Sequence, residues 1–355
     1  MPDYIIRESS AADSDALCEL VASVSMGQRI RIAFDRSPDY FIGAGVQAQK
    51  PLTIGCYQSD GRAVGVFTVG SRDVFMDGEK QSVRYLSDLR IHPEYRGGRL
   101  LFKGFAKLRD IVGNDAFLQT LILEDNVAAH ELLTSGRANL PRYHPAGRYQ
   151  TFFVPSRESP VPEVKGLVIR SAQPSDIAAM QVLYDAEASK RTFSPVYDFS
   201  FIEKDAYFAG LEIADFFLAF SDGELVGLVG LWDQSEFKRI RVTAYSPVIA
   251  WTRPIINWWS GVQLPRVGGS ISTLSGTACA IRGSDPIILN ALLCAATATM
   301  NKGKLFVLGF DERDPLIAGL NGLNARSEFG KHYLVTFGAR TPAKSKLFAF
   351  DAARI

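Results

Sequence analysis

The chain has 355 residues, of which 47% are hydrophobic and 22% are charged, with a formal net charge of +1. This length and composition are typical of a globular protein with two domains, and the small net charge gives no support for a nucleic-acid partner. Four separated cysteines without C-x-x-C spacing, and the absence of a signal peptide or a long apolar run, predict a cytoplasmic protein without metal, disulfide framework or membrane partner.

Two short patterns occur twice at almost the same offset. Ile6-Arg7 followed by Asp13 recurs 163 residues later, and the segment 59–65 recurs as 221–227, which is 162 residues later. The first pattern predicts a strand that leads into a helix. The second places apolar residues on both sides of an Asp-Gly turn, which predicts a hairpin.

A repeat of this length indicates a duplicated domain. The proline-rich segment 155–162 lies where a linker between the copies is expected. We therefore predict an N-terminal domain over residues 1–154, a linker over 155–165 and a C-terminal domain over 166–355.

In the first half, residues 83–91 have the pattern of a strand that Pro93 ends. Gly97 and Gly98 then allow a tight turn, and the apolar spacing of residues 101–112 predicts a helix with one buried face. The free N–H groups at such a helix start suit a phosphate or pyrophosphate, although a glycine turn of this kind also occurs as a plain structural corner.

The next segment follows the same scheme. Residues 120–124 predict a buried strand, Asp125-Asn126 a helix cap, and Ala129, Leu132 and Leu133 one face of a second helix.

Two motifs in this region resemble those of the GNAT acyltransferase superfamily. They are I-x-P-x-x-R-G at residues 91–97 and E-x-N-x-x-A-x-x-L at residues 124–132, and the resemblance covers residues 80–135 well. It implies an α/β (mixed α+β) fold with two tandem GNAT-like domains. Each would have a mostly antiparallel sheet with a splayed central strand pair, flanked by helices.

The resemblance also implies an acyl-CoA cofactor, usually acetyl-CoA, and residues that bind it. Its pyrophosphate would lie on the backbone amides of the loop Arg96, Gly97, Gly98, Arg99, Leu100 and Leu101. The pantetheine arm would pair with the backbone of Leu89, Arg90 and Ile91. Asn126 would lie near the cofactor sulfur or act only as a helix cap.

The sequence departs from the family pattern at three positions. Arg99 and Leu101 stand where the loop usually has glycine, or glycine or alanine. Leu133 stands where many members have a tyrosine that protonates the leaving thiolate. The usual general acid is therefore missing from its usual place.

Other residues could serve the acid and base steps of acyl transfer. Asp88, on the strand expected to splay, is the candidate base, or it is an ordinary carboxylate at a strand end. Tyr143 is the candidate acid, with His130 and His144 as alternatives that would otherwise be packed or surface residues.

The second half keeps the element order but not the glycine turn. Residues 280–286 contain one glycine, followed by a predicted helix and a strand at 304–309, so we interpret this half as a degenerate copy. Asp311 and Asp314 are expected to form only a helix start.

Three of the four tryptophans lie in residues 251–259. Interdomain packing is the favoured role for this cluster, ahead of contact with an acceptor or a partner. Residues 261–269 have the composition of a long loop, which often carries function.

The predicted function is an N-acyltransferase in which the amine of a small molecule or peptide attacks an acyl-CoA thioester, with acetyl-CoA as the donor that the resemblance implies. The alternative is a non-catalytic CoA-binding or regulatory protein that retains the fold. Transfer of a longer acyl group stays open, and neither the acceptor nor the oligomeric state follows from the sequence.

Overall fold

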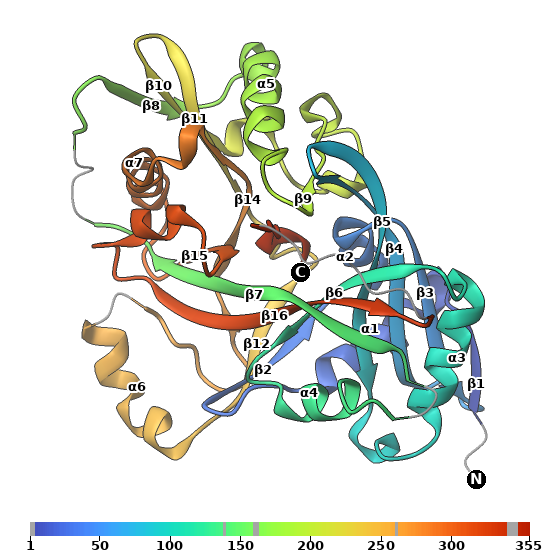
Figure 1. Ribbon diagram of the computed structural model, residues 1–355. Coiled ribbons are helices and arrows are strands. Elements are labelled where there is room, and N and C mark those ends of the chain that lie inside the picture. The colour runs from blue at the N-terminus through green and yellow to red at the C-terminus, as the bar shows by residue number, and fades with distance from the viewer. Residues whose placement is uncertain (1–3, 138–139, 159–162, 260–261, 339–346) are drawn as a thin grey trace.

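The computed structural model describes residues 4–137, 140–158, 163–259, 262–338 and 347–355. Thirteen strands of this described part form one sheet that runs through both halves of the chain (Figure 1). In spatial order its strands are β1 (Tyr4–Glu8), β3 (Gln49–Gln58), β4 (Ala63–Met76), β5 (Glu79–Ile91), β6 (Phe117–Leu123), β16 (Arg326–Thr336), β7 (Arg142–Pro155), β15 (Leu305–Asp311), β14 (Thr273–Ile281), β11 (Glu224–Trp232), β10 (Phe216–Ser221) and β8 (Leu167–Ser171), with β9 (Ser194–Pro195) paired to β4.

A second, small sheet also joins the two halves, because β2 from the first half pairs with β12 from the second. Its strands are β2 (Ile30–Asp35), β12 (Arg239–Tyr245) and β13 (Ser270–Ile271). The α-helices of the described residues are α1 (Ser14–Ser23), α2 (Tyr40–Gln47), α3 (Leu100–Val112), α4 (Val127–Leu133), α5 (Ile177–Ala188), α6 (Pro247–Trp259) and α7 (Pro286–Ala298). None of the helices described is long and apolar enough to cross a membrane.

The sheet is antiparallel except where β5 meets β6 and β14 meets β15. These two parallel pairs occupy corresponding places in the two halves, so the predicted mixed α/β class with a mostly antiparallel sheet is confirmed. The way in which the halves join was not predicted. Strand β16 lies between β6 and β7, and residues 149–155 of β7 pair with β15, so each half contributes a strand to the other.

The repeated sequence pattern corresponds to a repeated ion pair. Arg7 contacts both carboxylate oxygens of Asp13, at 2.6 and 2.8 Å, and Arg170 contacts those of Asp176 at 2.7 and 2.8 Å. Each pair ties the first strand of its half to the start of the following helix. The Asp-Gly segments form the predicted hairpins, between β3 and β4 and between β10 and β11.

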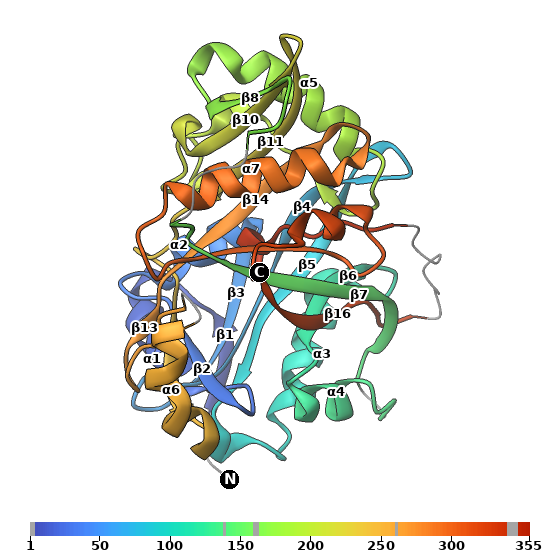
Figure 2. The same ribbon diagram turned by 90° about the vertical axis from the view of Figure 1, so that its left-hand side faces the viewer.

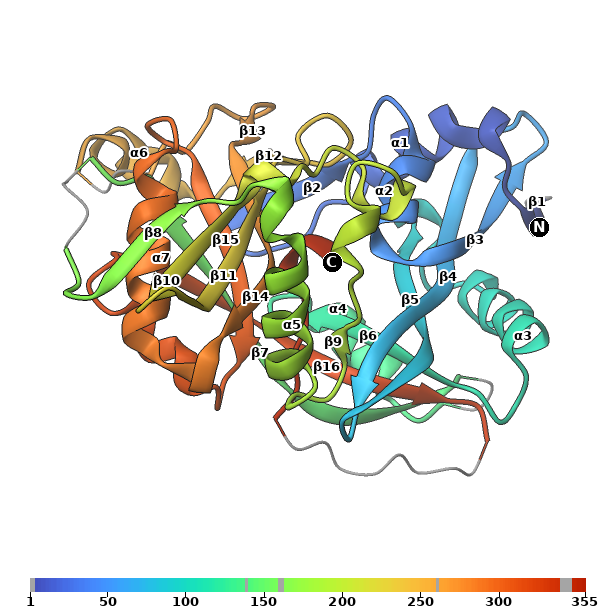
Figure 3. The same cartoon turned by 90° about the horizontal axis from the view of Figure 1, so that it is seen from above.

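Helices cover both faces of the first half of the sheet (Figure 3). Helices α1 and α2 pack on one face, where Leu17 of α1 and Tyr40 of α2 are buried in one cluster with Val66 of β4. Helices α3 and α4 pack on the other face. Leu101, Phe105 and Leu108 of α3 are buried against this second face, and Val112 is partly buried there. The predicted apolar face of this helix is therefore confirmed.

The interdomain role predicted for the tryptophan cluster is wrong for two of its members. Trp251 and Trp258 lie on α6 and are 81% and 82% exposed. The inner face of the helix is formed instead by Ile249 and Ile256, which pack beside the small sheet. Figure 2 shows α6 next to β13, apart from the main sheet. The loop predicted over 261–269 lies partly outside the described residues, as does the linker.

A buried histidine in β16 predicts a pH dependence of stability. His332 is fully buried among Phe193, Phe348 and Phe350, with ring centroids 4.9–5.6 Å apart. Burial lowers its pKa to about 3 from the usual 6.5. Below pH 6.5 the unfolded chain therefore binds a proton that the folded chain does not, and the free energy of unfolding falls with falling pH.

We expect His332 to account for a loss of about 2 kcal/mol between pH 7 and pH 5. Urea denaturation of the wild type and of His332→Leu at both pH values measures this contribution as the difference between their pH dependences. Equal pH dependence in the two proteins would contradict it.

Candidate functional site

Strands β5 and β6 separate after a short parallel contact. They pair only at Arg84 with Leu118 and at Tyr85 with Gln119. Beyond this point β5 carries a bulge, where its pairing with β4 shifts in register and Asp88 adopts a φ of +50°. Bulges bend a strand and redirect its side chains, so the end of β5 diverges from β6.

A cavity of about 280 Å³ lies at this separation and reaches both faces of the sheet. On the face of α3 and α4 its walls include Leu101, Asn126, Ala129, Leu133 and Tyr143. On the face of α1 and α2 they include Phe34, Arg36, Gln47 and Tyr85. Asp88, Leu89, Arg90, Ile91 and Arg96 line it from β5 and the segment that follows, and Ile355 lines it from the second half. The cleft (the cavity with these walls) thus connects two compartments through the gap between the strands.

Helix α3 begins beside the cleft. Gly97 has a φ of +77°, and Arg99, the residue at the helix start, makes no capping hydrogen bond with its side chain. The first amides of an α-helix have no partner within the helix, so those of α3 are available to an anion. Leu100 and Leu101 are buried, whereas Arg99 is exposed. The two leucines therefore pack inward and do not crowd the turn.

Comparison with known proteins identifies this arrangement. The chain matches no protein-family model and no curated protein sequence. Among solved structures it superimposes on a GCN5-related N-acetyltransferase from Sphaerobacter thermophilus with a TM-score of 0.56, 13% identity and coverage of 98% of this chain and 100% of that one. The chain has the GNAT fold.

Two further structures support the same fold. A GCN5-related N-acetyltransferase from Anabaena variabilis matches with a TM-score of 0.53 and 11% identity, over 94% of this chain and 72% of the other. The N-myristoyltransferase of Saccharomyces cerevisiae, solved with bound myristoyl-CoA, matches with a TM-score of 0.58 and 12% identity, over 94% and 78%. The fold that the two sequence motifs predicted is therefore confirmed. The separation of β5 and β6 corresponds to the splayed central strand pair expected for this fold.

The second motif lies at the start of α4. Asn126 is its N-cap, and its side-chain oxygen accepts a hydrogen bond from the amide of Ala129 at 3.3 Å. Asn126 also lines the cleft, so it caps the helix and borders the cavity at the same time. Leu133, at the position where the GNAT pattern often has tyrosine, is buried in the core and lines the same cleft.

The predicted base Asp88 is buried and has a partner that sequence reasoning missed. Its carboxylate lies 3.2 Å from the guanidinium of Arg36, and the two side chains are 4% and 2% exposed. The hydroxyl of Tyr40 donates to the same carboxylate at 3.3 Å. Gly43 leaves room for the arginine, because a Cβ there would lie 2.1 Å from Nη1. The bulge and this buried ion pair together fix the carboxylate at the cleft.

The predicted acid Tyr143 lies on β7 and lines the cleft beside Leu133. Burial raises the pKa of its hydroxyl well above 10, so the group keeps its proton at ordinary pH, and the same shift makes it a weaker acid. The alternatives His130 and His144 have other partners and are not among the cleft residues. His130 contacts the hydroxyl of Tyr333 and His144 that of Thr336.

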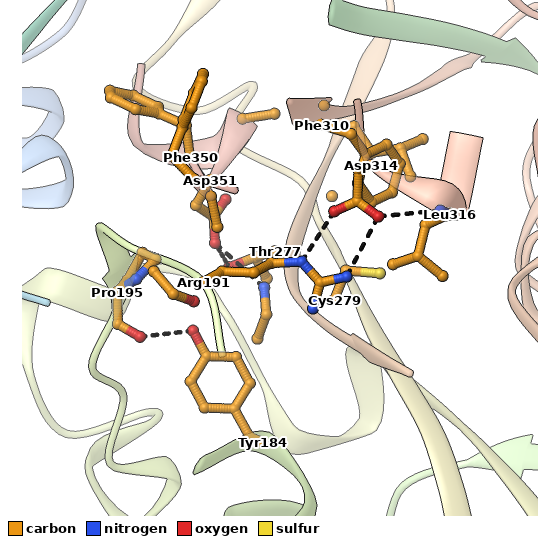
Figure 4. A pocket seen from close by; sticks show the side chains of 18 residues that line it. Tyr184, Arg191, Pro195, Thr277, Cys279, Phe310, Asp314, Leu316, Phe350 and Asp351 are labelled. Carbon is orange, nitrogen blue, oxygen red and sulfur yellow. Dashed lines mark hydrogen bonds and ion pairs between the residues drawn. The ribbon is translucent and has the colours of Figure 1, made fainter. Parts of the chain in front are cut away.

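The second half contains a matching but filled site. Strands β14 and β15 pair at three positions and then separate, and Ala278 has a φ of +47° at the place that corresponds to the bulge at Asp88. Residues 348–352 occupy the gap and leave a cavity of about 60 Å³ (Figure 4). Asp351 accepts hydrogen bonds there from Thr277 Oγ1 at 2.7 Å and the amide of Ala278 at 3.1 Å.

Two acidic residues of the second half also have structural partners. Asp314 caps the short 3-10 helix Pro315–Leu320, as predicted, and pairs with Arg191 at 2.8 Å. Asp311 pairs with Arg313. Among the described residues, no group of three or more histidine, cysteine, aspartate or glutamate side chains could hold a metal ion.

Proposed function

We propose that this protein is an N-acyltransferase that binds an acyl-CoA, with acetyl-CoA as the expected donor, in the first half of the chain (1–154). The observation that carries the proposal is the cleft where β5 and β6 separate, because it joins a free helix start on one face to a polar compartment on the other. The second half (166–355) would shape the acceptor side, and its own gap is filled by residues 348–352.

The cofactor would occupy the face of α3 and α4. Its pyrophosphate would accept hydrogen bonds from the amides at the start of α3, where the helix dipole favours an anion. The pantetheine would lie along the free edge of Leu89, Arg90 and Ile91, whose backbone groups no longer pair with β6. This places the thioester at the gap between the strands, near Asn126.

The acceptor amine would enter from the opposite face. Its nitrogen attacks the thioester carbonyl carbon, the carbon–sulfur bond breaks, and an amide forms. Asp88 would take the proton that the nitrogen loses, directly or through water. Tyr143 would give its proton to the departing thiolate. It would take the role of the tyrosine that many GNAT members have at the position of Leu133.

Calorimetric titration of acetyl-CoA, followed by a screen of amines for release of free CoA thiol, tests this function. Micromolar binding together with thiol release that depends on an amine supports an N-acyltransferase of a small molecule or peptide. Binding without thiol release for any amine would favour the non-catalytic alternative. Absence of binding at concentrations well above micromolar would overturn both.

Removal of the Tyr143 hydroxyl should slow turnover. We expect Tyr143→Phe to lower kcat about 10²-fold, because general acid catalysis typically contributes 10²–10⁴-fold, while KM for acetyl-CoA stays within about threefold. Tyr333→Phe is the matched control, since its ring contacts that of Tyr143 at 5.6 Å but its hydroxyl faces His130. Equal kcat values in the two variants would remove Tyr143 from the mechanism.

A further inference from the structure

The acceptor side of the cleft carries two guanidinium groups and one carboxylate, with Arg36 and Asp88 buried and Arg90 partly buried. Arg36 and Arg90 both line it, and Asp88 is the one acidic side chain among its described lining residues. Arg36 already pairs with Asp88. Arg90 donates from Nη1 to the neighbouring carbonyl of Leu89, at 3.1 Å, and makes no ion pair with a carboxylate of the described residues, although Asp88 acts on its charge from a distance.

Several polar atoms in this compartment are buried without a partner. They include Nε of Arg90, Nε and Nη1 of Arg36, Oγ of Ser87 and Oε1 of Gln47, and all four residues line the cleft. The arginine nitrogens and the serine hydroxyl are donors, whereas Oε1 of Gln47 is an acceptor. Buried donors are normally satisfied, and one without a partner destabilises the folded protein. The side chain of Arg36 is only 2% exposed, so solvent does not satisfy it.

A guanidinium cannot relieve this imbalance by losing its proton in the way that a lysine can. Burial and the neighbouring Arg36 lower the pKa of Arg90, whereas Asp88 opposes the change. Nearby, burial lowers the pKa of Lys238 to about 7, and Arg36 adds to the shift. The unpartnered nitrogens of Arg36 and Arg90 are therefore what favours an anionic ligand in this compartment.

We propose that the cleft binds a carboxylate beside the thioester, with Arg90 as its hydrogen-bond donor and Arg36 as the second cation. This inference rests on the proposed function, because it concerns the substrate that meets the acyl-CoA. One uncompensated guanidinium matches a single negative charge, and the adjacent Asp88 disfavours a phosphate dianion. The CoA phosphates themselves belong at the start of α3, on the other face.

The carboxylate has two possible sources. It belongs either to the acceptor, as in an amino acid, or to the acyl group, as in a dicarboxylic acyl-CoA. Both sources place the same chemistry next to Arg90, and matched probes distinguish them.

The test compares ligands that differ only in the carboxylate. Calorimetry measures Kd for succinyl-CoA against butyryl-CoA, and for amino acids against their carboxamides with and without saturating CoA. We expect the carboxylate member of one pair to bind at least about tenfold more tightly in the wild type. Arg90→Gln should reduce that ratio to within about twofold, and Arg90→Lys should restore part of it.

Arg96→Gln is the matched control because Arg96 lines the same cleft on the side of the α3 turn. It should weaken both members of each pair equally and leave their ratio unchanged.

Binding of CoA with ratios near one in both arms would overturn the carboxylate site and leave the proposed function standing. If CoA does not bind, the proposed function fails. In that case a tenfold preference for amino acids over carboxamides without CoA would still support the site, and a ratio near one would overturn it.

Discussion

Replacement of Gly97 by valine is expected to raise Kd for CoA at least about 100-fold, a loss of about 2.7 kcal/mol of binding free energy. Gly97 has a φ of +77°, a conformation that a β-branched residue rarely adopts. Valine would therefore shift the backbone of the turn that sets the amides at the start of α3. A Cβ at this position meets no atom within 4 Å, so the added side chain causes no clash in the core and the effect comes from the backbone.

Gly113, which follows the last residue of the same helix, provides the matched control. It has a φ of +82° and also open space around a Cβ. Gly113→Val should destabilise the fold by about 1–3 kcal/mol, because this positive-φ conformation is one that glycine alone adopts readily, but it should leave Kd for CoA unchanged. Calorimetry and thermal denaturation of both variants separate strain from binding. Unchanged affinity in Gly97→Val, or equal losses in the two variants, would contradict a cradle at this turn.

Local sequence signals predicted the first half of the site well. Pro93 predicted the end of β5, and Gly97 and Gly98 predicted the turn. Apolar residues spaced three and four apart predicted α3, and all of these signals depend on residues close together in the sequence. Asn126 was predicted in the same way, as a residue that caps the next helix. The Asp-Gly turns likewise predicted both hairpins from residues that are neighbours in the sequence.

Contacts between distant parts of the chain were not predictable in this way. Arg36 and Asp88 are 52 residues apart, and neither position carries a local pattern that names the other. The insertion of β16 between β6 and β7 depends on pairing between strands that are far apart in the sequence. The filling of the second gap by residues 348–352 likewise depends on the tertiary fold. One signal was present but incompletely interpreted, since Arg7 and Asp13 recur because they form an ion pair.

The tryptophan cluster shows a further limit of composition. Aromatic residues are usually buried on average, which favoured a packing role for residues 251–259. In α6, however, Trp251 and Trp258 share the outer face, while Ile249 and Ile256 form the inner face. Helical spacing within the segment separates these two faces, so the position of each residue carries more information than the count.

Asp88→Asn is expected to have the second large effect, on both catalysis and stability. Asparagine keeps the shape of the side chain but neither accepts the amine proton nor balances the buried Arg36. We expect kcat to fall about 10²–10⁴-fold because the general base is lost. The free energy of unfolding should also fall, by about 3–5 kcal/mol, because a buried cation is left without its partner.

A buried ion pair in the second half distinguishes these two effects. Arg191 and Asp314 are 10% and 2% exposed and lie 2.8 Å apart, away from the cleft. Asp314→Asn should therefore lose comparable stability, measured by urea denaturation, but keep its kcat at temperatures where the protein is folded. If Asp88→Asn also keeps kcat within about threefold under those conditions, then Asp88 is a structural partner of Arg36 and the proton must leave the amine by another path. A selective loss of kcat in Asp88→Asn, with CoA affinity retained, places the base on the bulge of β5, where the sheet opens between the two compartments.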